Sequence, residues 1–126
     1  MSNDTLQIEL VSADRVVWSG QAREVIARTV EGDLGVLPNH APLLSLLVPG
    51  VVEIKPVEGS PFRASVGEGF LSVADNRVSI LSEDAFLDSE IDVAAAKADL
   101  AAAESANDVE AVKVAEARIR TVEKTS

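Results

Sequence analysis

His40 is the only histidine of the chain, and it is the first residue to test for catalytic chemistry. Ser45 and Asp33 lie near it in the sequence, and a serine, a histidine and an acid can together form a hydrolytic triad. There is no second histidine to share a metal ion and no cysteine to serve as ligand or nucleophile. Strand-like residues and two prolines give the three side chains no reason to converge. We therefore predict no catalytic residues, no cofactor and no metal site.

Residues 32–44 read Gly-Asp-Leu-Gly-Val-Leu-Pro-Asn-His-Ala-Pro-Leu-Leu, which indicates a shaped recognition loop. Gly32 and Gly35 allow backbone angles that a side chain would forbid, and prolines two residues either side of His40 fix the chain direction. His40 is then either hydrogen-bonded within its own loop or part of an interface.

The elements that must position this loop are predicted to be short β-strands. From about residue 5 to residue 87, Val and Ile recur with a period of two, as in the alternating Leu6, Ile8 and Leu10. Turn residues recur at intervals typical of a β-sandwich. Both residues of Asp75-Asn76 tolerate the positive φ of a tight hairpin turn, which would leave Val78 and Ile80 on one face. We predict an all-β sandwich as the N-terminal domain, residues 1–87.

The composition changes at about Asp88, beyond which alanine is frequent and Gly and Pro are absent. Ser89 followed by Asp92 resembles a capping box and predicts a first helix over residues 90–104. Asn107 or Asp108 is expected to cap a second helix. Residues 88–126 are thus predicted to form a C-terminal antiparallel α-helical hairpin. The apolar stripe expected on the second helix consists of Val109, Val112, Ala115, Ile119 and Val122.

The first helix offers mostly alanines for packing. Each contact therefore contributes less stabilising free energy than the about 1.5 to 3 kcal/mol that a fully buried large aliphatic side chain provides. A helical segment with high propensity and little buried area can undock without unfolding its neighbour. The hairpin is therefore either a moving part or an inert tail.

The net charge of -10 argues against nucleic acid and anionic lipid as direct partners, because both are negatively charged. No apolar run is long enough to span a bilayer, and the polar N-terminus does not resemble a secretion signal. The absence of cysteine excludes disulfides and is compatible with a reducing cytoplasm.

The loop at 32–44, with Trp18-Ser19-Gly20 before it and Gly69-Phe70-Leu71-Ser72-Val73 after it, resembles the epsilon subunit of bacterial F-type ATP synthase. The similarity spans nearly the whole chain. It implies an accessory rotor subunit of the central stalk that is not itself an enzyme and that couples the gamma subunit to the c-ring. It also implies a peripheral location at the cytoplasmic face of the bacterial plasma membrane, with only indirect membrane association.

The resemblance also assigns expected contact residues. Asp33 matches an acid that lies beside the polar loops of the c-ring, and Ser12 matches a gamma-facing strand position. The surface shared with gamma and the ring is expected to include His40, Ala41, Pro42 and Leu43.

Basic residues are concentrated in the second predicted helix, namely Lys113, Arg118, Arg120 and Lys124. In the family such a helix, when extended, contacts acidic segments of the catalytic subunits and inhibits ATP hydrolysis, so alpha and beta subunits are further expected partners. The alternative is a solvated helix face, because exposed ion pairs typically contribute only about 0 to 1 kcal/mol.

Some family members bind ATP through an Ile-Asp-x-x-Arg-Ala segment, whose counterpart here is residues 91–96. Ala95 replaces the arginine, which leaves little positive charge to neutralise the phosphates of ATP. We therefore expect ATP to bind with a Kd no lower than the millimolar range. A ligand-sensing module, in which the hairpin closes over a small molecule, is an alternative that Ala95 disfavours. A β-sandwich adaptor outside the synthase is a third, which the loop resemblance disfavours.

Overall fold

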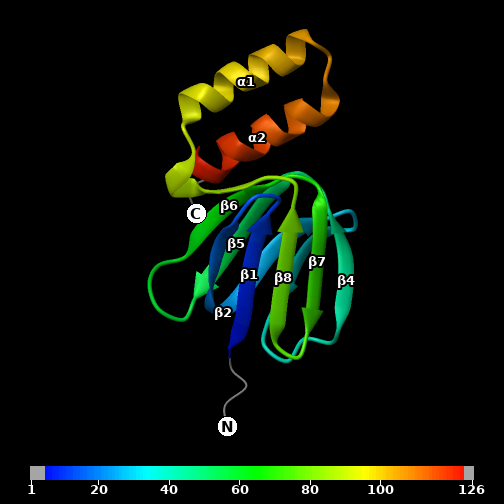
Figure 1. The fold of residues 1–126 in the computed structure, drawn as a ribbon, viewed down its shortest axis with the longest axis vertical. Coiled ribbons are helices and arrows are strands. Elements are labelled where there is room, and N and C mark those ends of the chain that lie inside the picture. Colours follow the sequence, from blue (N-terminus) through cyan, green and yellow to red (C-terminus); the bar gives the residue numbers. More distant parts are fainter. Residues whose placement is uncertain (1–4, 124–126) are drawn as a thin grey trace.

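Nine β-strands form the body of the chain, and two helices follow them, in the computed structural model that describes residues 5–123 (Figure 1). The strands are β1 (Leu6–Ser12), β2 (Val16–Thr29), β3 (Gly32–Val36), β4 (Leu43–Leu47), β5 (Gly50–Pro56), β6 (Phe62–Val66), β7 (Gly69–Ala74), β8 (Arg77–Ser82) and β9 (Ala85–Leu87). A single turn of 3-10 helix (Asp88–Glu90) leads into α1 (Val93–Ser105) and α2 (Val109–Glu123).

The long strand β2 connects the two layers of the sandwich. Its first half pairs antiparallel with β1, and its second half pairs with β3 and β5. The sheet runs in the order β1-β8-β7-β4-β2-β5-β6-β9, with β1 and β8 parallel. The predicted fold class, a β-sandwich followed by a helical hairpin, is confirmed.

The core lies between the two layers and consists of alternate strand residues. Leu6, Ile8 and Leu10 are fully buried, as their spacing predicted, and Val78 and Ile80 are buried together on β8. The turn between β7 and β8 also forms as predicted, with φ of 52° at Asp75 and 60° at Asn76. Period-two alternation has therefore identified the inner face of the sandwich.

The start of the first helix differs from the prediction. The side chain of Asp92, and not that of Ser89, caps α1 by accepting a hydrogen bond from the Ala95 amide at 3.2 Å. Residues 88–90 instead form the separate 3-10 turn, so α1 begins at Val93 and not at Glu90. The second cap matches one of the two predicted residues, because the side chain of Asp108 accepts from the Ala111 amide at 3.1 Å.

Helix α2 lies between α1 and the sandwich, where it contacts β5 and β6 (Figure 1). Its fully covered residues are small, namely Ala115, Ala117 and Thr121, and α1 buries only Ala96 and Ala103. The predicted stripe is wrong at Val109, which is 66% exposed. The buried residues of both helices are therefore small, and most of them are alanines. Within residues 5–123, neither helix is long and apolar enough to cross a membrane.

Candidate interaction surfaces

The loop that contains His40 is pinned to the turn between β7 and β8. The backbone amide of Asn39, which has a φ of 69°, donates to Asn76 Oδ1 at 2.6 Å, and Asn76 Nδ2 donates to Asn39 Oδ1 at 3.3 Å. His40 Nδ1 lies 2.7 Å from the carbonyl oxygen of Ala41, so its ring is held within its own loop. Ala41 and Pro42 are exposed beside it and Leu43 is half-buried. The loop is therefore an ordered, partly apolar surface.

Asp33 does not lie in this cluster. It sits near the opposite end of β3, next to Gly32, where its Oδ1 accepts from Arg28 Nε at 3.1 Å. The two side chains are exposed and line a groove whose other wall is the C-terminal part of α2, including Arg120. The structure thus separates Asp33 from the His40 loop and places it beside the hairpin.

Ser12 is buried, with 7% of its surface exposed, and its hydroxyl donates to Asp14 Oδ1 at 2.9 Å. It therefore presents almost no side chain to a partner. The outward residue at this point of β1 is Val11, which is half-buried and pairs with Leu81 of β8.

An exposed apolar surface crosses the outer face of β4, β7 and β8, and sequence reasoning missed it. Leu46 pairs with Phe70, and Phe70 pairs with Leu81, so the three side chains stand in one row. Each is about half exposed, at 50%, 49% and 49% respectively, and Leu44 on the same face is 71% exposed. We call these four residues the outer apolar row. Contiguous exposed apolar side chains mark protein interfaces.

A sequence signal for this surface exists in β4, which reads Leu-Leu-Ser-Leu-Leu. Leucines at both odd and even positions put apolar side chains on both faces of a strand. A strand that is apolar on both faces is covered on both faces, either by its own chain or by a partner.

The basic residues that α2 contains have different surroundings. Lys113 and Arg120 are exposed, whereas Arg118 is half-buried and paired with Asp84 and Asp99. Lys124 lies outside the described residues. Arg118 is therefore engaged within the chain while the hairpin is docked.

A small hollow lies at the segment that corresponds to the family's ATP-binding motif. It includes Ala95 and Ala96, and its volume of about 120 Å³ is well below the about 300 Å³ at which ligand pockets begin. Its charged lining consists of Arg118 and the three acids Glu90, Asp92 and Asp99. Acids around a small hollow repel phosphates, which supports the expectation of weak ATP binding.

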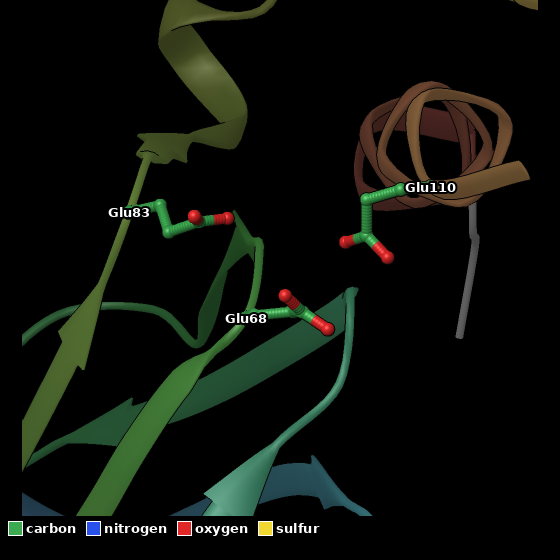
Figure 2. Close-up of side chains that lie close together, drawn as sticks. All are labelled: Glu68, Glu83 and Glu110. Atoms are coloured by element: carbon green, nitrogen blue, oxygen red, sulfur yellow. The ribbon is translucent and has the colours of Figure 1, made fainter. Parts of the chain in front are cut away.

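Three glutamates face one another where the hairpin meets the sandwich (Figure 2). Glu68 lies between β6 and β7, Glu83 lies between β8 and β9, and Glu110 lies in the first turn of α2. One carboxylate oxygen of each lies within 4.8 Å of the others. All three residues are exposed, but slight desolvation of the Glu110 carboxylate, and then the charge of Glu68, raise the pKa of Glu110. The three like charges therefore oppose docking of this end of α2.

We expect Glu110→Gln to stabilise the folded chain at pH 7, but less so at pH 5. A raised native pKa means that the folded chain takes up the proton more readily than the unfolded chain, so the repulsion fades as pH falls toward the ordinary glutamate pKa. The gain is about 0.5 kcal/mol or less, because exposed charges are screened. Urea unfolding at both pH values measures it. Glu116→Gln, an exposed position on α2 outside the cluster, is the matched control, and an equal gain there would contradict the assignment.

The β-sandwich with its outer apolar row, ordered loop and lightly packed hairpin defines a protein that works by binding other chains. Comparison with known proteins agrees with this class. A family model described as "ATP synthase, Delta/Epsilon chain, beta-sandwich domain" matches residues 5–88. The ATP synthase epsilon chain of Rhodococcus jostii is 50% identical over 120 residues, which covers 94% of this chain and 97% of that relative. The epsilon chain of Streptomyces griseus is 49% identical over 117 residues, with 93% and 94% covered.

Solved assemblies contain chains of similar structure. One is in the Euglena gracilis mitochondrial ATP synthase, OSCP/F1/c-ring, with a TM-score of 0.73 and 26% identity over 95% of this chain and 78% of that chain. Another, in the Tetrahymena thermophila mitochondrial ATP synthase central stalk and c-ring, has a TM-score of 0.60 and 18% identity, with 94% and 99% covered, and shows the shared fold alone.

The chain belongs to the ATP synthase epsilon chain family. The resemblance found in the sequence is confirmed, as is the prediction of a non-catalytic stalk subunit. Family membership makes the chain part of the F1 sector, peripheral to the membrane.

Proposed function

We propose that the chain couples the gamma subunit to the c-ring in the central stalk of a proton-translocating F-type ATP synthase, at the cytoplasmic face of a bacterial plasma membrane. The observation that carries this proposal is the outer apolar row, because an exposed row of large apolar side chains on a rigid sheet fits a permanent protein partner. The similar chain of 26% identity belongs to an ATP synthase assembly that includes F1 and the c-ring, which supports this placement.

The outer apolar row and the His40 loop fit two different kinds of contact. The row fits gamma, because large apolar side chains are buried best in a stable interface. His40, Ala41, Pro42 and Leu43 form the surface shared by gamma and the ring. Asp33, at the other end of β3, is a separate proposed ring contact. The sandwich, residues 1–87, is thus the binding domain of the proposal.

The hairpin, residues 88–126, is the proposed regulatory domain and restrains ATP hydrolysis. Its small buried residues hold it to the sandwich with little apolar area, which suits an element that changes position. Exposed Lys113 and Arg120 fit acidic segments of the catalytic alpha and beta subunits, and Lys124, outside the described residues, is proposed for the same surface. Arg118 joins this surface only after leaving its partners in the sandwich.

Ending the chain at Leu87 tests the division of roles, because β9 ends there and no strand is lost. In synthase-bearing membranes we expect ATP hydrolysis to rise severalfold while proton-driven ATP synthesis continues. Membranes with the full chain and membranes without the chain are the controls. Unchanged hydrolysis would leave the hairpin with a packing role only, and loss of synthesis would show that the hairpin itself is needed for coupling.

A further inference from the structure

One side chain of α2, that of Arg118, connects the hairpin to the sandwich. Its Nη2 donates to Asp84 Oδ2 at 3.2 Å, and its Cζ lies 4.9 Å from the centre of the Phe86 ring. Its Nη1 lies 3.8 Å from Asp99 Oδ2 on α1. Asp84 and Phe86 belong to the end of the sandwich, so the guanidinium binds both neighbours of α2 at once.

This contact is strong compared with the rest of the docking surface. The arginine side chain is only 24% exposed, and a partly desolvated guanidinium attracts both a carboxylate and an aromatic face more than an exposed one does. The fully buried side chains of α2 are small, namely Ala115, Ala117 and Thr121. A second hydrogen bond joins α2 to the sandwich, because Arg63 Nε donates to the Thr121 carbonyl oxygen at 3.0 Å. Its acceptor is a backbone atom and carries no side-chain charge.

The Arg118 contact is also incomplete, which favours its opening. Arg118 Nε and Asp84 Oδ1 are buried and have no hydrogen-bond partner among the residues that the structure describes. A partly satisfied buried pair holds less well than a complete one. About two helical turns earlier, Glu110 faces Glu68 and Glu83 and opposes the docking of the same helix.

We propose that Arg118 is a latch with two alternative carboxylate partners: Asp84 when the hairpin is docked, and an acidic surface of another subunit when it is released. The two states exclude each other, because in the docked state the guanidinium is covered by Phe86 and its outer nitrogens face Asp84 and Asp99. The second partner rests on the proposed inhibitory function, whereas the latch itself does not. Replacing Asp84 therefore releases the hairpin with the Arg118 side chain still present. Replacing Arg118 releases the hairpin without that side chain.

Hydrogen exchange of the α1 and α2 amides in the full chain tests the latch. An undocked hairpin of two short helices is marginal in water, so its amides exchange soon after release. We expect Asp84→Asn and Arg118→Gln each to accelerate this exchange about tenfold, the effect of losing one charge-assisted contact. Glu116→Gln removes the same charge as Asp84→Asn without touching Arg118 and should not accelerate it. Unchanged exchange in both latch variants, with the fold intact, would overturn the latch.

ATP hydrolysis by the complex reconstituted with each variant then tests the second partner. Asp84→Asn should lower ATP hydrolysis relative to the complex with the unsubstituted chain, because it releases the hairpin with Arg118 available. Arg118→Gln should release the hairpin equally without lowering hydrolysis. Equal inhibition by both variants would overturn the role of Arg118 outside the chain. Accelerated exchange with hydrolysis unchanged in both would retain the latch and overturn the inhibitory function on which the second partner rests.

Discussion

Replacing Phe70 by aspartate is expected to abolish binding of the chain to the gamma subunit and to leave its fold intact. Phe70 stands at the centre of the outer apolar row, between Leu46 and Leu81, and half of its surface is exposed in the isolated chain. An aspartate there would be buried without a cation once gamma binds. An unpaired buried charge costs about 3 kcal/mol or more, which corresponds to more than about a hundredfold in Kd.

The effect on folding should be small, because the side chain points away from the core and strand propensity differs by about 1 kcal/mol at most between residue types. Co-purification with gamma measures binding, and thermal unfolding of the free chain measures the fold. Val109→Asp is the matched control, since Val109 is a more exposed apolar residue on the hairpin, outside the row. Full binding by a folded Phe70→Asp chain would show that the row is not the gamma interface.

The sandwich could be predicted because its signals are local. Leu6, Ile8 and Leu10 alternate with more polar residues, and alternation alone identifies a half-buried strand and its inner face. The turn at Asp75-Asn76 depends only on two residues that tolerate positive φ. Neither inference requires knowledge of what lies far away in the sequence.

The helix start was mispredicted because a distant contact decides it. Ser89 and Asp92 both suit a cap, but Glu90 accepts two hydrogen bonds from Arg15 at 2.8 Å and one from the Leu87 amide at 2.9 Å. These bonds, which lower the pKa of Glu90, hold residues 88–90 in a separate turn. Asp92 is then the residue that caps α1. A contact between residues 75 positions apart has no signature in a local pattern.

The candidate site was predicted only in part for related reasons. The ordered shape of the His40 loop could be predicted because glycine and proline spacing is visible in the sequence, whereas its role in an interface stays a prediction. The ion pair between Arg118 and Asp84 could not be predicted. Basic residues on a helix indicate a solvated or partner-binding face unless the fold brings an acid such as Asp84 close to them. The outer apolar row could not be located from the sequence, because large apolar side chains in a strand indicate a buried face until the fold leaves them uncovered.

Replacing Gly69 by alanine is expected to destabilise the chain by about 3 kcal/mol, the upper range for overpacking of a rigid site. Gly69 begins β7 and pairs with Ser82 of β8. A Cβ added there would lie 1.8 Å from the carbonyl oxygen of Leu81 and 2.8 Å from its carbonyl carbon. These are backbone atoms that cannot turn away, so the two strands would have to separate. The loss is a large share of the about 5 to 15 kcal/mol that stabilises an ordinary domain.

Gly35→Ala is the matched control for urea unfolding, because it is also a strand glycine whose added Cβ would meet only Glu24 Oε2, at an ordinary 3.6 Å. We expect it to change the free energy of unfolding by less than about 1 kcal/mol. Similar losses at both positions would contradict the close approach of β7 to β8. Because Gly69 precedes Phe70 directly, separating these strands would also displace the centre of the outer apolar row. Gly69→Ala should therefore weaken gamma binding even in the fraction of chains that remains folded, whereas Gly35→Ala should not.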